Sequence, residues 1–213
     1  MTIVVHHLQY SRSTRLLWLL EELEQPYELV LYERDPSFRA PEALKQVHPL
    51  GRSPIIEIDG EVIAESGAIM EVLAERLGGG RLGRRSTDAD WAEYCEWLHF
   101  AEGTAMTGLT MMMLTTASPN PMVSGYGQEL ATTAMALIDA RITGRDYLLA
   151  SGFGAADIHM SFVALWANEF GLLSGHPQVA AWLDRITARP AYLAALDKGG
   201  PWRVPLELLP AQK

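Results

Sequence analysis

Two segments of the sequence carry residues whose types and spacing can do chemistry. Residues 10–15 read Tyr-Ser-Arg-Ser-Thr-Arg and place several hydroxyl groups directly before an apolar pattern with helical spacing. Residues 48–66 end in Glu65-Ser66, where a second helical pattern begins. Free backbone N–H groups at the start of a helix bind anions, and a serine hydroxyl adds to such a site. The sequence therefore predicts polar sites at the starts of two helices.

The second of these segments predicts a β-hairpin that leads into a helix. Two apolar runs, Ile55–Ile58 and Val62–Ala64, flank Asp59-Gly60, a pair that favours a tight hairpin turn. Pro54 precedes the first run, where a proline can start a strand but could not continue one. Apolar residues at helical spacing follow the second run: Ile69, Val72, Leu73 and Leu77.

This segment resembles the glutathione-binding segment of a cytosolic glutathione transferase, of the serine type found in bacteria and fungi. In that family a cis proline precedes the third strand, and the residue before it pairs through its backbone with the cysteinyl part of glutathione. An acidic residue and a serine at the next helix bind the γ-glutamyl part. Ser53-Pro54 and Glu65-Ser66 match this pattern at the expected separation. Ser53 departs from the usual Val or Ile, a change that keeps the backbone contact.

The order of predicted elements agrees with this resemblance. A strand, a helix and a strand within about 30 residues form a βαβ unit, and a hairpin with a helix follows it. This order predicts a thioredoxin-like α/β domain over residues 1–80. The elements are strands at 3–5 and 27–32 with a helix at 16–24 between them, a short helix near 42–46, and the hairpin with its helix.

A glycine- and arginine-rich break at residues 78–85 marks the predicted domain boundary, with the linker at 81–87. Residues 88–213 are predicted to form an all-helical domain for electrophile binding and dimerisation. Its helices are expected from Thr87 through Met113, at 128–142, from Ala155 through Trp166, at 177–186, and from Pro190 onward, with an extended tail at 201–213.

Ser11 is the candidate catalytic residue. Thioredoxin-like folds place a reactive group after the first strand, where the helix terminus favours a negative charge. Here the group is a hydroxyl, which can donate a hydrogen bond to the glutathione sulfur and favour the thiolate. Members of the serine type carry their serine four residues before an arginine, the spacing of Ser11 and Arg15. Tyr10 and Ser13 are alternative hydroxyls, and Ser11 or Ser13 can instead simply cap the helix.

The resemblance also implies residues that bind the glycyl end of glutathione and residues that line the electrophile pocket. Arg52 matches a position that often carries a basic contact to the glycyl carboxylate of glutathione, and Arg39 lies in a loop that supplies a second one. Both arginines can equally be solvated surface residues. Met106 and Met113 lie on the helix that builds the electrophile pocket in this family, and their adaptable side chains suit an apolar wall or ordinary core packing.

Two acidic residues of the helical domain stand out. Asp157, in Gly154-Ala-Ala-Asp157, resembles the capping box of this family, with glycine in place of the hydroxyl residue, and is interpreted as structural. Glu102 lies on an otherwise apolar helical stripe, where a carboxylate is costly unless it is paired. An internal partner and a functional role are both open for Glu102.

Composition excludes several classes of protein. The chain has 213 residues, enough for a core in one or two domains, and its net charge of −9 argues against a nucleic-acid surface. No apolar run approaches the roughly 18–20 residues that cross a bilayer, and the N-terminus lacks a signal-peptide pattern. Cys95, expected as a buried helical residue, is the single cysteine and forms no metal motif. We expect a cytoplasmic protein without nucleic-acid or membrane partners, metal or cofactor.

The resulting hypothesis is a detoxifying glutathione transferase, with glutathione as co-substrate, that activates its thiol for attack on small apolar electrophiles. Glutathione-dependent peroxide reduction or disulfide exchange, and a non-catalytic glutathione-binding scaffold, remain alternatives. The resemblance implies a homodimer, and the aromatic residues Trp91, Tyr94 and Trp97 offer more apolar area than one packing face needs.

Overall fold

The computed structural model describes residues 1–203, so residues 204–213 of the predicted tail lie outside the described part. The chain divides into two compact units. The first comprises residues 1–81 together with the described residues from 189 onward, and the second comprises residues 82–188. Each unit has its own core.

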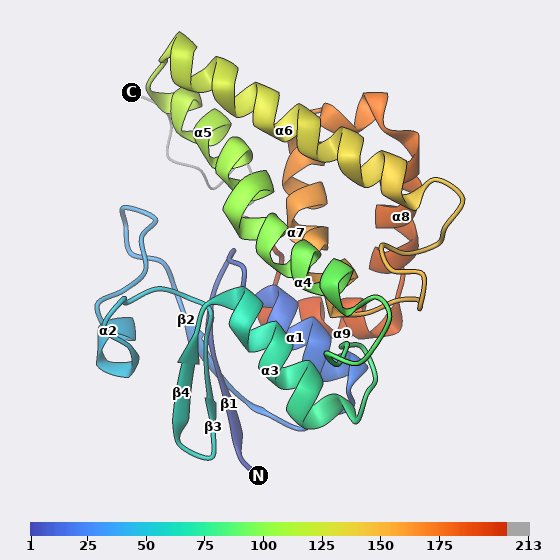
Figure 1. Cartoon of the computed structure of the whole chain (residues 1–213). Coiled ribbons are helices and arrows are strands. Elements are labelled where there is room, and N and C mark those ends of the chain that lie inside the picture. Colours follow the sequence, from blue (N-terminus) through green and yellow to red (C-terminus); the bar gives the residue numbers. More distant parts are fainter. Residues whose placement is uncertain (204–213) are drawn as a thin grey trace. The chain divides into compact units, whose positions relative to one another are not determined.

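The first unit is built on a four-stranded mixed sheet with the strand order β2-β1-β3-β4 (Figure 1). Strand β1 pairs parallel with β2 and antiparallel with β3, and β3 pairs antiparallel with β4. This is the predicted thioredoxin-like α/β arrangement. The strands are β1 (Ile3–Leu8), β2 (Glu28–Tyr32), β3 (Ile55–Ile58) and β4 (Glu61–Ala64).

The hairpin turn forms where the sequence predicts it. Ile58 pairs with Glu61, so the loop contains only Asp59 and Gly60. Their φ angles of 48° and 86° suit a turn whose twist matches that of the strands. The Asp59 carboxylate also accepts a hydrogen bond from the Thr2 N–H at 2.7 Å, which ties the turn to the start of the chain.

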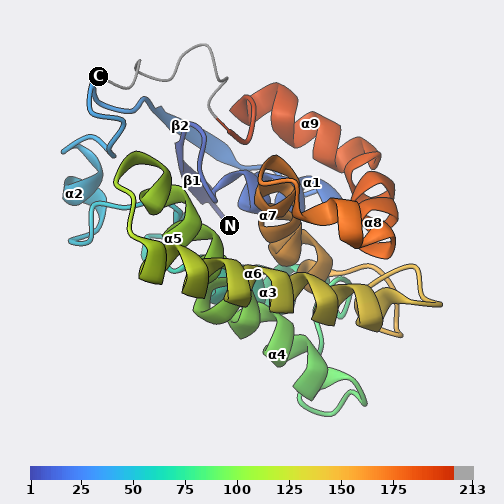
Figure 2. The same cartoon turned by 90° about the horizontal axis from the view of Figure 1, so that it is seen from above.

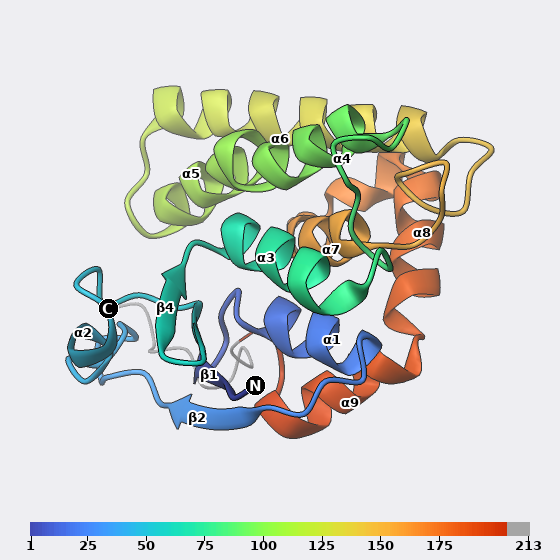
Figure 3. The ribbon, with the colours of Figure 1, turned by 60° about the horizontal axis from the view of Figure 1, so that its bottom comes forward.

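Helices cover both faces of this sheet. Successive side chains of β1 point to opposite faces. Leu8 and Ile55 pack against Leu44 of α2 on one face. Helices α1 and α3 contact the strands and each other, and α9 packs along α1 (Figures 1 and 3). The helices are α1 (Thr14–Glu22), α2 (Leu44–Val47), α3 (Ser66–Gly78) and α9 (Pro190–Gly199).

Helix α9 belongs to the first unit, although the sequence assigned residues 88–213 to one helical domain. The ring centroids of Trp18 and Tyr192 lie 4.8 Å apart, and Arg189 forms an ion pair with Glu22 at 2.6 Å. A Cβ atom at Gly199 would clash with the Leu17 side chain, so glycine permits the close approach of α9 to α1. Apolar periodicity identified this helix but gave no sign of which core it joins.

The second unit is helical, and no strand occurs in residues 82–203 of the described chain. Figure 2 shows α5 and α6 running alongside each other. The elements are α4 (Trp91–Phe100), the π-helical turn η1 (Ala101–Ala105), α5 (Met106–Ala117), α6 (Pro121–Ile142), α7 (Ala155–Glu169), the 3₁₀ turn η2 (Leu172–Gly175) and α8 (Pro177–Thr187).

The long helix predicted from Thr87 through Met113 is interrupted by the π turn η1. A π turn inserts an extra residue into the helical repeat and rotates the faces on its two sides relative to each other. Glu102, in this turn, is half-buried, as is Cys95. The prediction of surplus apolar surface on α4 is also wrong in part, because Tyr94 and Trp97 are buried in the helical unit.

Helix α6 begins at Pro121, seven residues before the predicted start. The side chain of Asn120 accepts a hydrogen bond from the Val123 N–H at 3.2 Å and caps the helix. Pro121 then occupies a first-turn position, where a backbone N–H would have no intrahelical acceptor, so its absence in proline costs no hydrogen bond. In the sequence, Pro119 and Pro121 indicated only the end of the preceding helix.

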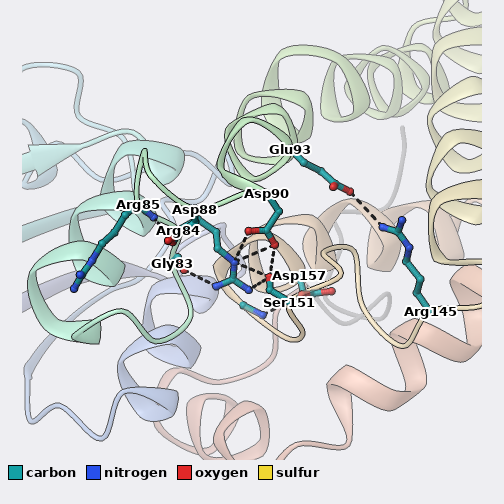
Figure 4. Close-up of polar contacts among 10 residues, drawn as sticks. Gly83, Arg84, Arg85, Asp88, Asp90, Glu93, Arg145, Ser151 and Asp157 are labelled. Atoms are coloured by element: carbon teal, nitrogen blue, oxygen red, sulfur yellow. Dashed lines mark hydrogen bonds and ion pairs between the residues drawn. The ribbon is translucent and has the colours of Figure 1, made fainter.

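Buried and half-buried polar contacts hold the loops of the second unit (Figure 4). The Asp157 carboxylate accepts hydrogen bonds from the backbone N–H groups of Leu148 and Gly154, both at 3.0 Å, and from the Trp182 indole at 2.8 Å. Burial raises the pKa of Asp157 to about 6, although these three hydrogen bonds act to lower it. These contacts support the structural interpretation of Asp157.

Arg84 donates a hydrogen bond to Ser151 and forms an ion pair with Asp90 at 3.2 Å. These contacts connect the start of this unit to the loop before α7.

Two glycines make the close contact between α5 and α6. A Cβ atom at Gly127 would lie 2.8 Å from the Met111 Cβ and 2.9 Å from the Gly108 carbonyl oxygen. We predict that Gly127→Ala lowers the free energy of unfolding by about 1–2 kcal/mol, since the clash outweighs the gain in helix propensity. Gly125→Ala is the matched control, because a methyl group there has no neighbour within 4 Å. It should raise stability by about 0.5–1 kcal/mol. Equal stabilisation by both variants in thermal unfolding would show that the helices are not in close contact.

Candidate functional site

The candidate site is formed at the turn between β1 and α1. Tyr10 adopts a φ of 57°, which turns the chain sharply after the strand. Ser11 follows it and is mostly buried, with 8% of its surface exposed. Its hydroxyl oxygen lies 2.8 Å from that of Ser13 and 3.4 Å from that of Ser53. The turn thus brings the predicted catalytic serine beside the residue that precedes Pro54.

Ser13 is fully buried, and its hydroxyl is part of a longer hydrogen-bonded chain. The Ser13 oxygen lies 2.8 Å from Nδ1 of His7, and Nε2 of His7 lies 2.8 Å from the carbonyl oxygen of Gly199. Ser13 is at the N-cap position of α1, but its side chain does not cap the helix. The capping role expected for Ser13 is therefore wrong, because its hydroxyl is engaged with the buried imidazole.

The Ser53–Pro54 peptide bond is cis, as the resemblance implied. The Ser53 hydroxyl accepts a hydrogen bond from the Leu8 N–H at 3.4 Å and can donate to the His6 carbonyl at 3.3 Å. A Val or Ile at this position could make neither bond. The departure from the usual residue therefore adds polar contacts between β1 and the segment before β3.

The start of α3 forms the second half of the site. Helix α3 begins at Ser66, and Glu65 precedes it with a φ of 73° and an exposed side chain. A non-glycine residue in this backbone region is unusual and often marks a functional position. The Ser66 hydroxyl is buried and accepts a hydrogen bond from Nη2 of Arg15 at 3.1 Å. Arg15 thereby connects α1 to α3.

Arg34 supports the site and was missed in the sequence. Its guanidinium donates to the carbonyl oxygens of Gln9 at 3.0 Å and of Tyr10 and Phe38 at 2.8 Å each. These bonds fix the β1–α1 turn from the loop after β2. Burial lowers the pKa of Arg34, but an arginine remains charged at neutral pH. No short-range pattern signals this role, because Gln9 and Tyr10 lie 25 and 24 positions away in the sequence.

The other predicted site residues are not members of this hydrogen-bonded group. Arg39 and Arg52 are exposed, and their guanidinium groups form no hydrogen bond or ion pair within residues 1–203. Both are therefore open to solvent in the first unit. In the second unit Met106 is buried, whereas Met113 is 42% exposed.

His7 is the second residue that sequence reasoning missed. It is fully buried, and this burial lowers its pKa despite the hydrogen bond to Gly199. The predicted strand ended at Val5, whereas β1 continues through His6 and His7, whose side chains therefore point to opposite faces of the sheet. His6 is also buried and faces Tyr32 and Glu57, at 2.9 and 2.8 Å.

The arrangement can bind an anionic, peptide-like molecule. The first N–H groups of α3 have no acceptor within the helix and favour a carboxylate. The edge before Pro54 offers backbone groups, and the Ser11 hydroxyl lies beside it. Among the described residues no cluster of metal-ligating side chains occurs, and no helix is long and apolar enough to span a membrane.

Comparison with known proteins identifies both parts of the chain. The family model described as "Glutathione S-transferase, N-terminal domain" matches residues 2–75, and the corresponding C-terminal domain model matches residues 126–190. Glutathione S-transferase 3 of Schizosaccharomyces pombe is 32% identical over 92% of this chain and 87% of its own length. Glutathione S-transferase 1 of Saccharomyces cerevisiae is 32% identical over 92% and 94%, respectively.

Solved structures agree with these matches. A glutathione S-transferase from Actinobacillus pleuropneumoniae superimposes with a TM-score of 0.87 and 25% identity, over 99% of this chain and 98% of that chain. A sphingomonad glutathione S-transferase, solved in complex with glutathione, has the same fold, with a TM-score of 0.79 and 22% identity over 92% of this chain and 98% of that chain.

Proposed function

This chain belongs to the glutathione transferase family, and we propose that its Ser11 hydroxyl stabilises the thiolate of bound glutathione for attack on small apolar electrophiles. The observation that carries this proposal is the 3.4 Å separation of the Ser11 and Ser53 hydroxyl oxygens. If the cysteinyl part of glutathione pairs with the backbone of Ser53, its sulfur lies within reach of Ser11. A hydroxyl that donates to a thiolate favours the charged form and lowers the pKa of the thiol.

Glutathione would lie between the two helix starts of the first unit. The γ-glutamyl end would bind at Glu65 and Ser66, where the free N–H groups of α3 donate hydrogen bonds to its carboxylate. Ser53 and Pro54 would hold the cysteinyl part. Arg52, with Arg39 as a second cation, would meet the glycyl carboxylate, and both guanidinium groups are exposed and available for such an ion pair.

The chemistry of the site favours thiolate addition over disulfide exchange. Exchange through the protein itself needs a cysteine beside the glutathione sulfur. The segment from Tyr10 to Arg15 contains hydroxyls instead, and the first unit, which carries the proposed glutathione contacts, has no cysteine in its sequence. The electrophile would lie against Met106 and Met113, and detoxification of such compounds in the cytoplasm would be the biological role. Glutathione would be a co-substrate, with no further cofactor.

A homodimer is the proposed assembly. In the second unit several other large apolar side chains at the adjoining ends of α5 and α6 are exposed: Leu114, Met122, Val123 and Tyr126. Exposed apolar side chains grouped in this way favour association. We predict that light scattering at micromolar concentration gives a mass twice that of one chain, which is 23.5 kDa. The double variant Leu114→Glu with Tyr126→Glu should shift the protein toward monomer. A monomer for the unchanged protein would contradict the proposal.

Ser66→Ala tests the placement of the γ-glutamyl end. The variant loses the hydroxyl that Arg15 bonds and that glutathione would contact. We predict that the Kd for glutathione rises about tenfold, equivalent to about 1–2 kcal/mol, measured by calorimetry. Turnover at saturating glutathione should change less. Ser37→Ala, an exposed serine in the loop after β2, is the control. Wild-type affinity in both Ser66→Ala and Glu65→Ala would mean that glutathione binds elsewhere.

Ser11→Ala tests the thiolate mechanism. Loss of a hydrogen bond to a charged group costs about 1.5–3 kcal/mol, so the pKa of the bound thiol should rise by about one to two units. At neutral pH the rate should fall by about ten- to a hundredfold while glutathione affinity stays near normal. The loss should shrink as pH rises, because the thiol then ionises without help. The measurement is the pH–rate profile with one electrophile, and Tyr10→Phe is the control. If Tyr10→Phe loses activity and Ser11→Ala keeps the wild-type profile, Ser11 is the wrong hydroxyl.

A further inference from the structure

The hydrogen bonds of His7 have a defined direction. A carbonyl oxygen only accepts, so Nε2 of His7 carries the proton that bonds Gly199. Burial lowers the pKa of His7, so the ring is neutral at neutral pH and carries one proton in total. Nδ1 therefore presents a lone pair, and the Ser13 hydroxyl donates to it.

This direction continues through the two serines. Because Ser13 uses its proton on His7, its oxygen is left as an acceptor for the Ser11 hydroxyl at 2.8 Å. The other acceptors near these hydroxyls are more distant: the Leu8 carbonyl is 3.4 Å from the Ser13 oxygen, and the Ser53 oxygen is 3.4 Å from the Ser11 oxygen. Without a ligand, Ser11 thus donates inward and has a lone pair with which to receive a proton.

We propose that His7 accepts the proton of the glutathione thiol through Ser11 and Ser13. The thiol S–H bond breaks and its proton bonds the Ser11 oxygen, while the sulfur keeps the electron pair. The original Ser11 proton passes to the Ser13 oxygen, and the original Ser13 proton passes to Nδ1 of His7. The products are a thiolate and a protonated imidazole, and no other reactant is needed.

The transfer also explains how one hydroxyl serves both forms of the sulfur. Before transfer Ser11 accepts from the thiol. After transfer each hydrogen bond of the chain is reversed, so Ser11 donates to the thiolate, Ser13 donates to Ser11, and Nδ1 of His7 donates to Ser13. Nε2 keeps its proton on the Gly199 carbonyl throughout. The inference therefore rests on the proposed function and adds the destination of the proton.

The surroundings of His7 decide whether its charged form is tolerated. A buried imidazolium is unfavourable on its own, but here it forms together with a negative sulfur at the other end of the chain. The Gly199 carbonyl on α9 favours the charged ring, and its neighbours Ser13, before α1, and Leu17, on α1, are uncharged. The acid of β3, Glu57, bonds His6, whose side chain points to the opposite face of the sheet.

The test compares proton release with thiolate formation. Thiolate is followed by the ultraviolet absorbance of bound glutathione, and proton release by calorimetry in buffers of different ionisation enthalpy. For the wild type at neutral pH we expect fewer protons released than thiolates formed, together with ¹⁵N shifts of His7 that show an imidazolium in the complex. One proton released per thiolate, with His7 neutral in the complex, would overturn the proposal.

Variants separate this proposal from the proposed function. His7→Gln can keep the bond to Gly199 but has no basic nitrogen, so the pKa of the bound thiol should rise by about one unit or more, leaving at least tenfold less thiolate at neutral pH. A substitution of the neighbouring histidine, His6→Gln, should leave the titration unchanged.

If His7→Gln does not fold, the ¹⁵N measurement on the wild type still decides. If Ser11→Ala keeps the wild-type titration, the proposed function fails. If Ser11→Ala loses the thiolate while His7 stays neutral in the wild type, only the proton acceptor is wrong.

Discussion

The hydrogen bond between His7 and the Gly199 carbonyl is the constraint on which the rest of the site depends. It is buried and joins residues 192 positions apart in the sequence. Because a carbonyl can only accept, this bond selects the tautomer of the ring, and the tautomer sets the direction of the Ser13 and Ser11 hydroxyls. Helix α9 therefore contributes to the hydrogen-bonded group of the first unit, and Gly199 is the residue that lets this helix approach His7 and Leu17.

The polar atoms around this bond hold each other in place. A buried polar group without a partner costs about 1–3 kcal/mol, so each hydrogen bond made here also removes alternative arrangements. Arg34 holds three carbonyls of the turn and the loop after β2, and Arg15 bonds Ser66 at the start of α3. The Ser11 hydroxyl is thus held in place by contacts from several elements, as a preorganised site requires.

Local chemistry made part of this site predictable. Asp59-Gly60 determines a hairpin, Ser53-Pro54 was expected as a cis bond from the resemblance, and apolar spacing located the start of α3 at Ser66. The π turn at Ala101–Ala105 was not predictable, because apolar periodicity continues across it and only the packing of α4 and α5 reveals the shift. His7, Arg15 and Arg34 each have at least one partner that is distant in sequence, and a single sequence contains no information on which distant carbonyl or hydroxyl each will meet.

The electrostatics of the site also follow from tertiary structure and not from residue type. Ser13 would be an ordinary helix cap if His7 were exposed or protonated, and burial of the ring by α1 and α9 removes both conditions. In the same way Arg39 and Arg52 stay solvated, so the positive charge that they offer a ligand is not already neutralised by a carboxylate of the described chain.

A crystal structure of the complex with glutathione tests the central claim most directly, through the position of the sulfur. We expect the sulfur to lie within about 3.0–3.5 Å of the Ser11 oxygen, a range between ordinary hydrogen bonds and the longer contacts of sulfur. We also expect the cysteinyl backbone to pair with Ser53 and the γ-glutamyl carboxylate to lie at the N–H groups of α3. A sulfur directed at Tyr10, or glutathione bound away from Pro54 and Ser66, would contradict the role of Ser11.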